Sequence, residues 1–154
     1  MKLVASIIGT VLVLGACSDK PQTITSEITT ISVEDMPTLG PYSQAVEANG
    51  FVFLSGIVAY DAKAKSFVAA DIDTQTRQVF ANLEQVLAAA NLTLDDVVKT
   101  TVFLKNPKDF PRMNEIYTEY FSVHKPARST VPGVDWGRDD VLIEIEAVAV
   151  KPEQ

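Results

Sequence analysis

The stretch that decides the fold reads Val141-Leu142-Ile143-Glu144-Ile145-Glu146-Ala147-Val148-Ala149-Val150. Side chains of a β-strand alternate between two faces, so every second residue shares a face. One face is wholly apolar and consists of Val141, Ile143, Ile145, Ala147 and Ala149. The other carries Leu142, Glu144, Glu146, Val148 and Val150. Because two acids among apolar residues suit neither open solvent nor a dry core, we expect this second face to form an interface or the wall of a polar pocket.

The segment Lys125-Pro126-Ala127-Arg128-Ser129-Thr130 precedes this strand. Pro126 disfavours a helical conformation for Lys125, so we expect the preceding helix to end there and a loop to hold Arg128 in a fixed position. The guanidinium offers a planar fork of donors that matches a carboxylate in a bidentate way. From the residues alone, two roles for Arg128 stay open: binding a substrate carboxylate, or pairing structurally with Glu144 across a subunit boundary.

The N-terminus has the layout of a secretory signal. Lys2 precedes a mostly apolar run that is too short to span a membrane, and small residues follow it. The ending Leu14-Gly15-Ala16-Cys17 resembles a bacterial lipobox, whose cysteine becomes the lipidated first residue. The alternative is an ordinary signal peptide with a chance cysteine. Ser18 after the cysteine resembles the pattern of outer-membrane sorting.

We therefore expect residues 1–16 to be removed, residues 17–25 to form a lipidated polar tether, and residues 26–154 to form one domain. The expected location is the periplasm, as a lipoprotein anchored in the outer membrane. Removing residues 1–16 deletes Lys2, so 13 basic residues become 12 against 20 acids and the net charge moves from −7 to −8. Such a domain repels phosphate backbones, which argues against nucleic acid as a partner.

The rest of the chain alternates between strand and helix patterns. Asn49-Gly50 indicates a hairpin between residues 45–48 and 51–55, and Gly56 after it would allow a backbone or ligand to approach closely. The other expected elements are a strand over 24–33, a helix from Asp71 to Asn91, a strand over 97–104 and a helix after Asn106-Pro107-Lys108-Asp109. This order predicts an α+β fold with both helices on one face of the sheet, and the semi-polar opposite face then favours oligomerisation.

The residues of chemical interest form a small set. They are Tyr42, Ser43, His124, Arg128, Thr130, Glu144 and Glu146. With one histidine, and with the sole cysteine used for the lipid, we expect no metal site. No nucleophile motif supports His124 as a catalytic base, so a polar role at a helix end is the better interpretation.

Several blocks in order resemble the RidA (YjgF-type) family, and the resemblance runs from about Val33 to Val150. The blocks are Gly40-Pro41-Tyr42-Ser43-Gln44-Ala45, Leu54-Ser55-Gly56, residues 75–83, residues 96–103, Asn114-Glu115-Ile116-Tyr117, Pro126-Ala127-Arg128-Ser129 and Ile143-Glu144-Ile145-Glu146-Ala147. The resemblance implies a chorismate-mutase-like mixed sheet, a homotrimer with clefts between subunits, and hydrolysis of reactive imines and enamines to 2-keto acids and ammonia.

The resemblance also implies a role for each matching residue. Arg128 falls on the arginine that binds the substrate carboxylate, and Glu144 on the acid proposed to activate water. Tyr42 matches a tyrosine that lines the cleft from the neighbouring subunit. Thr130 stands where the family often has a cysteine and backbone groups help to hold the water, and Gly56 matches a glycine whose backbone lines the pocket. No metal or organic cofactor is implied.

The chain departs from the family pattern in two places. Ile57-Val58-Ala59 replaces the usual Gln-Ile-Pro, and Asp135-Trp136-Gly137-Arg138 stands where many members have Leu-Pro. These changes bear on substrate identity. They also keep a second class of function open: a non-catalytic module that binds a small carboxylate or a protein, or a holdase-like role. Ribonuclease activity, also claimed within the family, is disfavoured by the acidic charge and the predicted export.

Overall fold

The structure is a computed structural model that describes residues 27–152. The predicted signal segment, the whole tether with Cys17, and the first residues of the strand expected over 24–33 lie outside the described residues. None of the helices within 27–152 has the length and apolar character needed to cross a membrane.

Strands and helices follow one another largely in the predicted order. They are β1 (Ile28–Ile31), β2 (Ala45–Ala48), β3 (Phe51–Val58), β4 (Tyr60–Asp61), β5 (Ser66–Phe67), α1 (Ile72–Ala89), β6 (Val97–Leu104), α2 (Phe110–Tyr120), β7 (Ala127–Pro132) and β8 (Ile143–Val150). Short 3-10 helices at Leu94–Asp96 and Pro107–Asp109 precede β6 and α2.

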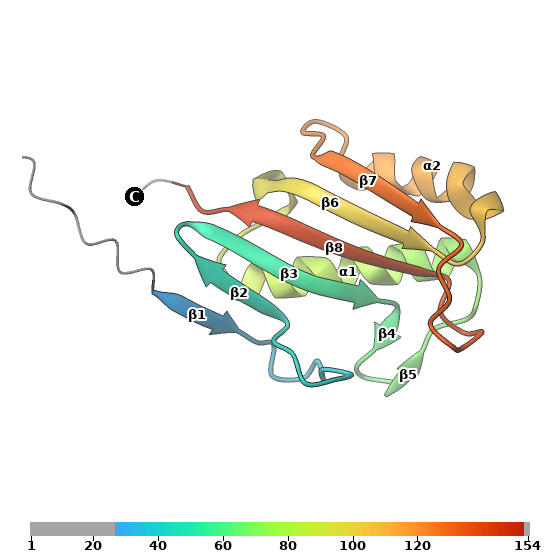
Figure 1. The fold of residues 1–154 in the computed structure, drawn as a ribbon, viewed down its shortest axis with the longest axis horizontal. Helices are drawn as coiled ribbons and strands as arrows, with labels where there is room; N and C mark the ends of the chain where they lie inside the picture. Colours follow the sequence, from blue (N-terminus) through green and yellow to red (C-terminus); the bar gives the residue numbers. More distant parts are fainter. Residues whose placement is uncertain (1–26, 153–154) are drawn as a thin grey trace, which may run out of the picture.

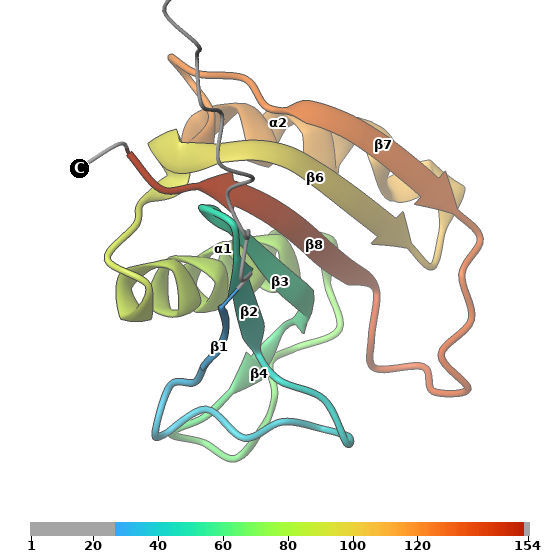
Figure 2. The ribbon, with the colours of Figure 1, turned by 60° about the vertical axis from the view of Figure 1, so that its left-hand side comes forward.

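Six of the strands form one mixed sheet in the order β1-β2-β3-β8-β6-β7. Only β6 and β7 run parallel to each other, and the remaining neighbours are antiparallel. Figures 1 and 2 show α1 and α2 side by side on one face of the sheet, with the other face uncovered. This confirms the predicted α+β architecture with both helices on one face.

Local sequence signals placed several elements correctly. The hairpin at Asn49-Gly50 joins β2 to β3, and both turn residues have positive φ, 52° and 78°. Asp71 caps α1 by accepting a hydrogen bond from the Thr74 N–H at 2.8 Å, and Asn91 has the left-handed φ of 59° expected just after a helix. Tyr117 of α2 and Phe121 directly after this helix are buried and pack against Phe80 of α1, whereas Phe110 at its start is exposed.

The predicted two faces of β8 are confirmed. Ile143, Ile145, Ala147 and Ala149 are buried under the helices, whereas Leu142 before the strand and Glu144, Glu146, Val148 and Val150 within it are half-buried or exposed. The prediction of a loop around Arg128 was wrong, because residues from Ala127 to Pro132 form the edge strand β7. Its parallel partner β6 precedes it in the sequence by more than 20 residues, with α2 between them. Parallel strands cannot be joined by a hairpin, so no turn motif predicts that β6 and β7 pair.

Candidate active site on the open face of the sheet

The open face contains a β-bulge at the centre of the sheet. Leu54 of β3 pairs with Ala147 of β8 and Ile57 pairs with Ile145, so Ser55 and Gly56 together oppose Glu146 alone. The Ser55 hydroxyl donates to the Ser43 carbonyl at 2.7 Å, which ties the bulge to the segment before β2. A bulge interrupts the ladder and redirects side chains, so this point of the sheet is suited to hold a site.

Glu144 lies against the backbone of the bulge. A Cβ atom at position 56 would lie 2.5 Å from the Glu144 carboxyl carbon and closer still to Oε1, so the carboxylate occupies the volume left empty by Gly56. The sequence led us to expect a backbone or a ligand close to Gly56, whereas the structure places the Glu144 side chain of the same chain in that space. Glycine at this position therefore sets where the Glu144 carboxylate lies.

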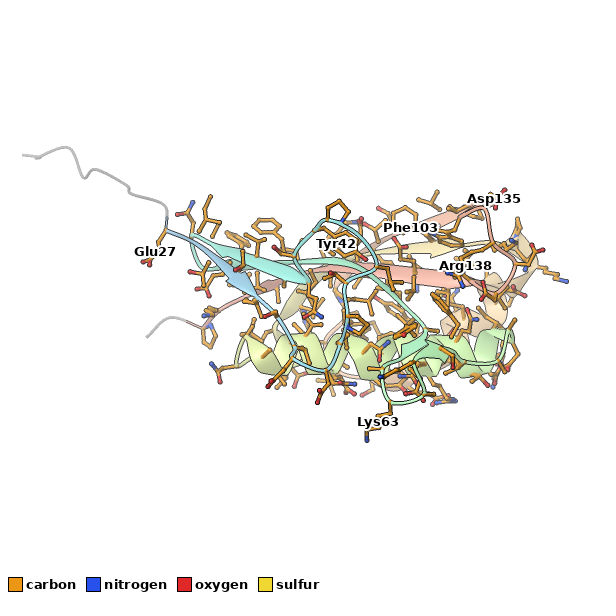
Figure 3. All side chains as sticks on the ribbon, turned by 90° about the horizontal axis from the view of Figure 1, so that it is seen from below. Glu27, Tyr42, Lys63, Phe103, Asp135 and Arg138 are labelled. Carbon is orange, nitrogen blue, oxygen red and sulfur yellow. The ribbon has the colours of Figure 1, made fainter. Side chains whose placement is uncertain are left out.

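Tyr42 reaches the same region from the segment between β1 and β2. The buried Gln44 side chain holds this segment, accepting from the Val33 N–H and donating to the Met36 carbonyl. Gly40 leaves room for the Tyr42 ring, since a Cβ there would lie 2.9 Å from it. Figure 3 shows Tyr42 on the face of the sheet away from α1.

A cavity of about 300 Å³, which we name the carboxylate cavity, is lined by Tyr42, Ser55, Gly56, Glu144 and Glu146. Burial raises the pKa of the Glu144 carboxyl above its ordinary value of 4.5. The indole N–H of Trp136, which donates to Glu144 Oε2 at 3.1 Å, lowers this pKa, and the neighbouring Glu146 raises it further. A half-buried carboxylate with a raised pKa is a better proton acceptor than an exposed one.

A second cavity of about 300 Å³ adjoins the first, and we name it the apolar cavity. It is lined by Leu39, Tyr42, Gly56, Val58, Phe67, Trp136, Arg138, Val141 and Glu144. The segment between β7 and β8 supplies Trp136 and Arg138, two residues from the stretch where the chain departs from the family pattern. Sequence reasoning noted the departure but assigned neither residue a role.

Arg128 lies elsewhere, on the helix side of the sheet at its β7 edge. Its register partner in β6 is the buried Thr100, and its guanidinium carbon lies 4.6 Å from the centre of the Tyr117 ring and 5.8 Å from that of Phe110. Within residues 27–152 it forms no ion pair or hydrogen bond through its side chain. Its donors are therefore available to a ligand.

The cavity beside this guanidinium, the arginine cavity, has a volume of about 350 Å³. Its lining residues are Asn114, Tyr117, Thr118, Phe121, Lys125, Pro126 and Arg128. Thr130 lies two residues further along β7 and therefore on the same face as Arg128. Sequence reasoning did not single out Asn114 as a site residue, although it lies within one of the quoted blocks. Burial raises the pKa of the Tyr117 phenol, which the Thr100 hydroxyl and the Arg128 charge both oppose.

One chain thus brings the candidate residues together in two groups on opposite faces. Tyr42, Gly56 and Glu144 meet on the open face, whereas Arg128 and Thr130 lie on the helix side, two strands away. His124 belongs to neither group, and one of its ring nitrogens, Nε2, lies 2.9 Å from the Val97 carbonyl. Among residues 27–152, no cluster of three or more His, Cys, Asp or Glu side chains could hold a metal ion.

Comparison with known proteins places this arrangement in a family. The family described as "Endoribonuclease L-PSP" matches residues 33–151. A RutC family protein of Pyrococcus horikoshii is 49% identical over 122 residues, which cover 79% of this chain and 96% of that protein. The 2-iminobutanoate/2-iminopropanoate deaminase of Salmonella typhimurium is 41% identical over 126 residues, 79% of this chain and 97% of the deaminase.

The fold agrees with solved structures as well. The crystal structure of E. coli TdcF with bound serine matches with a TM-score of 0.74 and 34% identity, covering 80% of this chain and 99% of that one. The match spans nearly the whole described domain, and the chain is a homologue of a 2-imino acid deaminase. The chain therefore belongs to the RidA/YjgF family, also called the L-PSP or RutC family.

Proposed function

We propose that this protein hydrolyses reactive 2-imino and 2-enamino acids to 2-keto acids and ammonia, in clefts that two neighbouring chains of a homotrimer build together. The observation that carries the proposal is the half-buried Glu144 carboxylate with a raised pKa, facing a cavity with Tyr42 and Gly56. The names of the relatives support the substrate class, since one is a deaminase of 2-iminobutanoate and 2-iminopropanoate.

Substrate binding falls to Arg128. Its planar guanidinium, unpaired within the described residues, matches the carboxylate that every 2-imino acid carries. The rings of Tyr117 and Phe110 support the guanidinium from one side and limit the directions in which it can point. Held in this way, the substrate presents its imine carbon in one orientation, and orientation is a large part of what this reaction needs.

The chemical step is the addition of water to an electrophilic carbon. Glu144 takes a proton from a water molecule, and the water oxygen forms a bond to the imine carbon, giving a tetrahedral carbinolamine. The nitrogen gains protons, the carbon–nitrogen bond breaks and ammonia leaves, so that the water oxygen becomes the keto oxygen. An enamine enters the same sequence after it takes up a proton at its terminal carbon. Backbone groups at Thr130 would help to hold the water.

A second copy of the chain completes the site. Glu144 and Arg128 lie on opposite faces of one sheet, so a cleft that contains both takes one of them from each of two chains. The open face also exposes apolar side chains, since Phe51 is 44% and Phe53 48% exposed, with their ring centres 6.2 Å apart. Closing three such faces around an axis would bury these rings and bring the open face of one chain to the β7 edge of the next.

A kinetic assay with imines made in situ tests the proposal. An amino-acid oxidase supplies the imine, and release of ammonia and keto acid is measured with and without the protein. Glu144→Gln and Arg128→Ala should each lower kcat/KM by about a hundredfold or more, because one removes the base and the other the anchor. Arg77→Ala is the matched control, since Arg77 pairs with Glu119 on the helical side. No acceleration by the wild-type protein would refute the proposal.

A second candidate function is binding without turnover. The bound serine in E. coli TdcF favours it, because that relative holds a small molecule with a carboxylate. A protein of this kind would be stabilised against heat by 2-keto acids or serine and would release no product, since selective binding to the folded state raises stability. A holdase-like role is a variant of this second candidate. For that role, Arg128→Ala should leave the protective activity unchanged.

We further propose that the domain is held at a membrane by lipid on Cys17. The support is the sequence Leu14-Gly15-Ala16-Cys17 and the polar tether that follows it. A lipoprotein cysteine that carries more than one acyl chain gives stable anchoring, whereas a single chain binds marginally. Intact-mass measurement on membrane-extracted protein should show loss of residues 1–16 and added lipid on Cys17. Recovery of processed protein with a free thiol would contradict the anchor.

A further inference from the structure

The apolar cavity and the carboxylate cavity share the three residues Tyr42, Gly56 and Glu144. The carboxylate cavity is polar, with two acids and Ser55 in its walls. The apolar cavity is closed mainly by Leu39, Val58, Phe67, Trp136 and Val141. A substrate whose imine carbon lies at Glu144 therefore has a hydrophobic compartment next to the reacting carbon, where its own side chain can lie.

Trp136 is the residue that joins the two compartments. Its indole N–H donates to Glu144 Oε2 at 3.1 Å, while the side chain lines the apolar cavity. The Trp136 side chain thus contacts the candidate base and also forms part of the wall of the apolar cavity. Glu144 also has Gly56 behind it, so its carboxylate is confined from two directions.

The segment that carries Trp136 is fastened to the rest of the fold. The Lys105 ammonium at the end of β6 donates to the Arg138 carbonyl at 2.7 Å and pairs with Asp139 at 2.9 Å. The Arg138 guanidinium makes two hydrogen bonds to Asp140, at 2.6 and 2.7 Å, and lies 4.1 Å from the centre of the Phe67 ring. These contacts hold the segment against β5 and β6. They also neutralise Arg138, the one cation that lines the apolar cavity.

Building on the proposed deaminase function, we propose that Trp136 is a positioning and specificity-determining residue: its N–H orients Glu144, and its ring receives the side chain of 2-imino acids with branched or aromatic apolar side chains. The methyl group of 2-iminopropanoate would fill little of a cavity of about 300 Å³. Each further methylene buried in such a pocket raises kcat/KM by about tenfold or more. A hydroxylated side chain gains less, because its hydroxyl would lose water against walls that are mainly apolar.

Comparison of imines made from alanine, leucine and serine tests the specificity. The imine carbon is planar, so a D-amino acid oxidase gives the same imines as an L-specific one, and one oxidase can supply all three. The full chain should hydrolyse the leucine-derived imine with kcat/KM at least about tenfold above that for the alanine-derived imine. The serine-derived imine should rank below the leucine-derived one.

Two variants separate the wall from the hydrogen bond. Trp136→Ala opens the apolar cavity and should abolish the preference for the leucine-derived imine. Leu39→Ala changes a half-exposed lining residue from the segment before β2, and it should reduce the same preference while the segment that carries Trp136 keeps its sequence. Val123→Ala, at a residue that is 91% exposed and lines neither the apolar nor the carboxylate cavity, is the control that should change nothing.

Trp136→Phe keeps a ring but removes the N–H. It should retain the side-chain preference, lower kcat about tenfold on all imines and leave KM nearly unchanged. Because the N–H stabilises the ionised carboxylate, its loss should also move the acid limb of the pH–rate profile to higher pH. The other groups that face Glu144 stay in place: Glu146 on β8, Tyr42 before β2, and Arg138, which Asp140 neutralises.

The outcomes distinguish this inference from the function on which it rests. A wild-type preference for the alanine-derived imine, or an undiminished leucine preference in both Trp136→Ala and Leu39→Ala, would overturn the specificity assignment and leave deamination standing. A Trp136→Phe variant with an unchanged kcat and pH profile would overturn the positioning role. Absence of turnover with every imine would instead overturn the proposed function, and the inference with it.

Discussion

The Glu144 carboxyl group occupies the space that a side chain at position 56 would fill, directly against the Gly56 backbone. The two residues lie on neighbouring strands, β8 and β3, at the bulge where Ser55 and Gly56 oppose a single residue. Because Gly56 has no side chain, it leaves space for the Glu144 carboxylate and so sets the position of that carboxylate. The relationship couples a backbone feature of the sheet to the candidate base of the reaction.

Gly56→Ala should displace the base while leaving the fold intact. The new methyl group would meet the far end of the Glu144 side chain, which can move away by rotating. A shift of about 1 Å in a catalytic group costs about a hundredfold in rate, so kcat/KM should fall by about that factor. Steady-state kinetics together with thermal unfolding measure the two effects separately.

Gly50→Ala is the matched glycine control. Gly50 has a φ of 78° in the hairpin turn, with open space around it. The substitution should lower the free energy of unfolding by about 1 kcal/mol through backbone strain and leave kcat/KM unchanged. If Gly56→Ala lost only stability, as Gly50→Ala should, the role assigned to Gly56 would be wrong.

Glu144→Gln should change the pH dependence of stability. The folded-state pKa of Glu144 is raised, mainly by burial, so the native state resists ionisation of this group more than the unfolded chain does. Its stabilising contribution is present below about pH 4.5, the unfolded value, and is lost as pH rises through the raised folded value. Glutamine does not titrate. The variant and the wild type should therefore melt alike near pH 4, and the variant should melt higher near pH 8.

Thermal unfolding at several pH values checks this expectation. Glu119→Gln is a suitable comparison, because the pKa of Glu119 is lowered by its hydrogen bonds to Arg77, the opposite direction. Its substitution should lower the melting temperature near pH 8 and have less effect near pH 4. Equal responses in the two variants would contradict the burial of Glu144.

The elements that sequence predicted correctly are those with local rules. Asn49-Gly50 predicts a two-residue turn because both residues tolerate positive φ. Asp71 predicts the start of a helix because its side chain can cap the helix N-terminus. The strand over 97–104 was predicted with its observed ends, since β-branched residues lie between two polar turns. The alternation of β8 predicted its buried and open faces in the same way.

What sequence missed depends on contacts between distant segments. β7 pairs with β6 in parallel across α2, and nothing local to Ala127–Pro132 signals this. The small β4–β5 hairpin includes Lys65 with a φ of 54°, a backbone conformation that the presence of a lysine does not predict. The contact of Trp136 with Glu144 could be suspected only from the departure from the family pattern. The resemblance supplied the candidate site residues, but their separation onto two faces of the sheet is visible only in the topology.

Arg128→Lys should show that the shape of the cation matters as well as its charge. Lysine keeps one positive charge but lacks the planar fork and the stacking against Tyr117, where the guanidinium carbon lies 4.6 Å from the ring centre. We expect KM for the imine to rise about tenfold with lysine and further with alanine. Kinetics over a range of imine supply rates give both constants. Full activity of the lysine variant would show that only the positive charge at position 128 matters, and would contradict a role for the planar guanidinium.

Mixed oligomers provide the sharpest test that two chains share each cleft. Arg128→Ala and Glu144→Gln are each expected to be inactive, because every cleft lacks one partner. If a cleft takes Arg128 from one chain and Glu144 from its neighbour, random mixing of the two variants in equal amounts restores about a quarter of the clefts. Co-expression with two different tags, followed by purification through both, removes the two homotrimers and leaves mixed trimers in which about one cleft of every three is restored.

The double variant mixed with wild-type chain is the control for this experiment. With shared clefts it should also retain about a quarter of the wild-type clefts after random mixing, whereas a cleft built within one chain would retain about half. A single-chain cleft would in addition leave the first mixture inactive. Recovery in the first mixture requires Arg128 and Glu144 to act from different chains, as we propose from their places on opposite faces of one sheet.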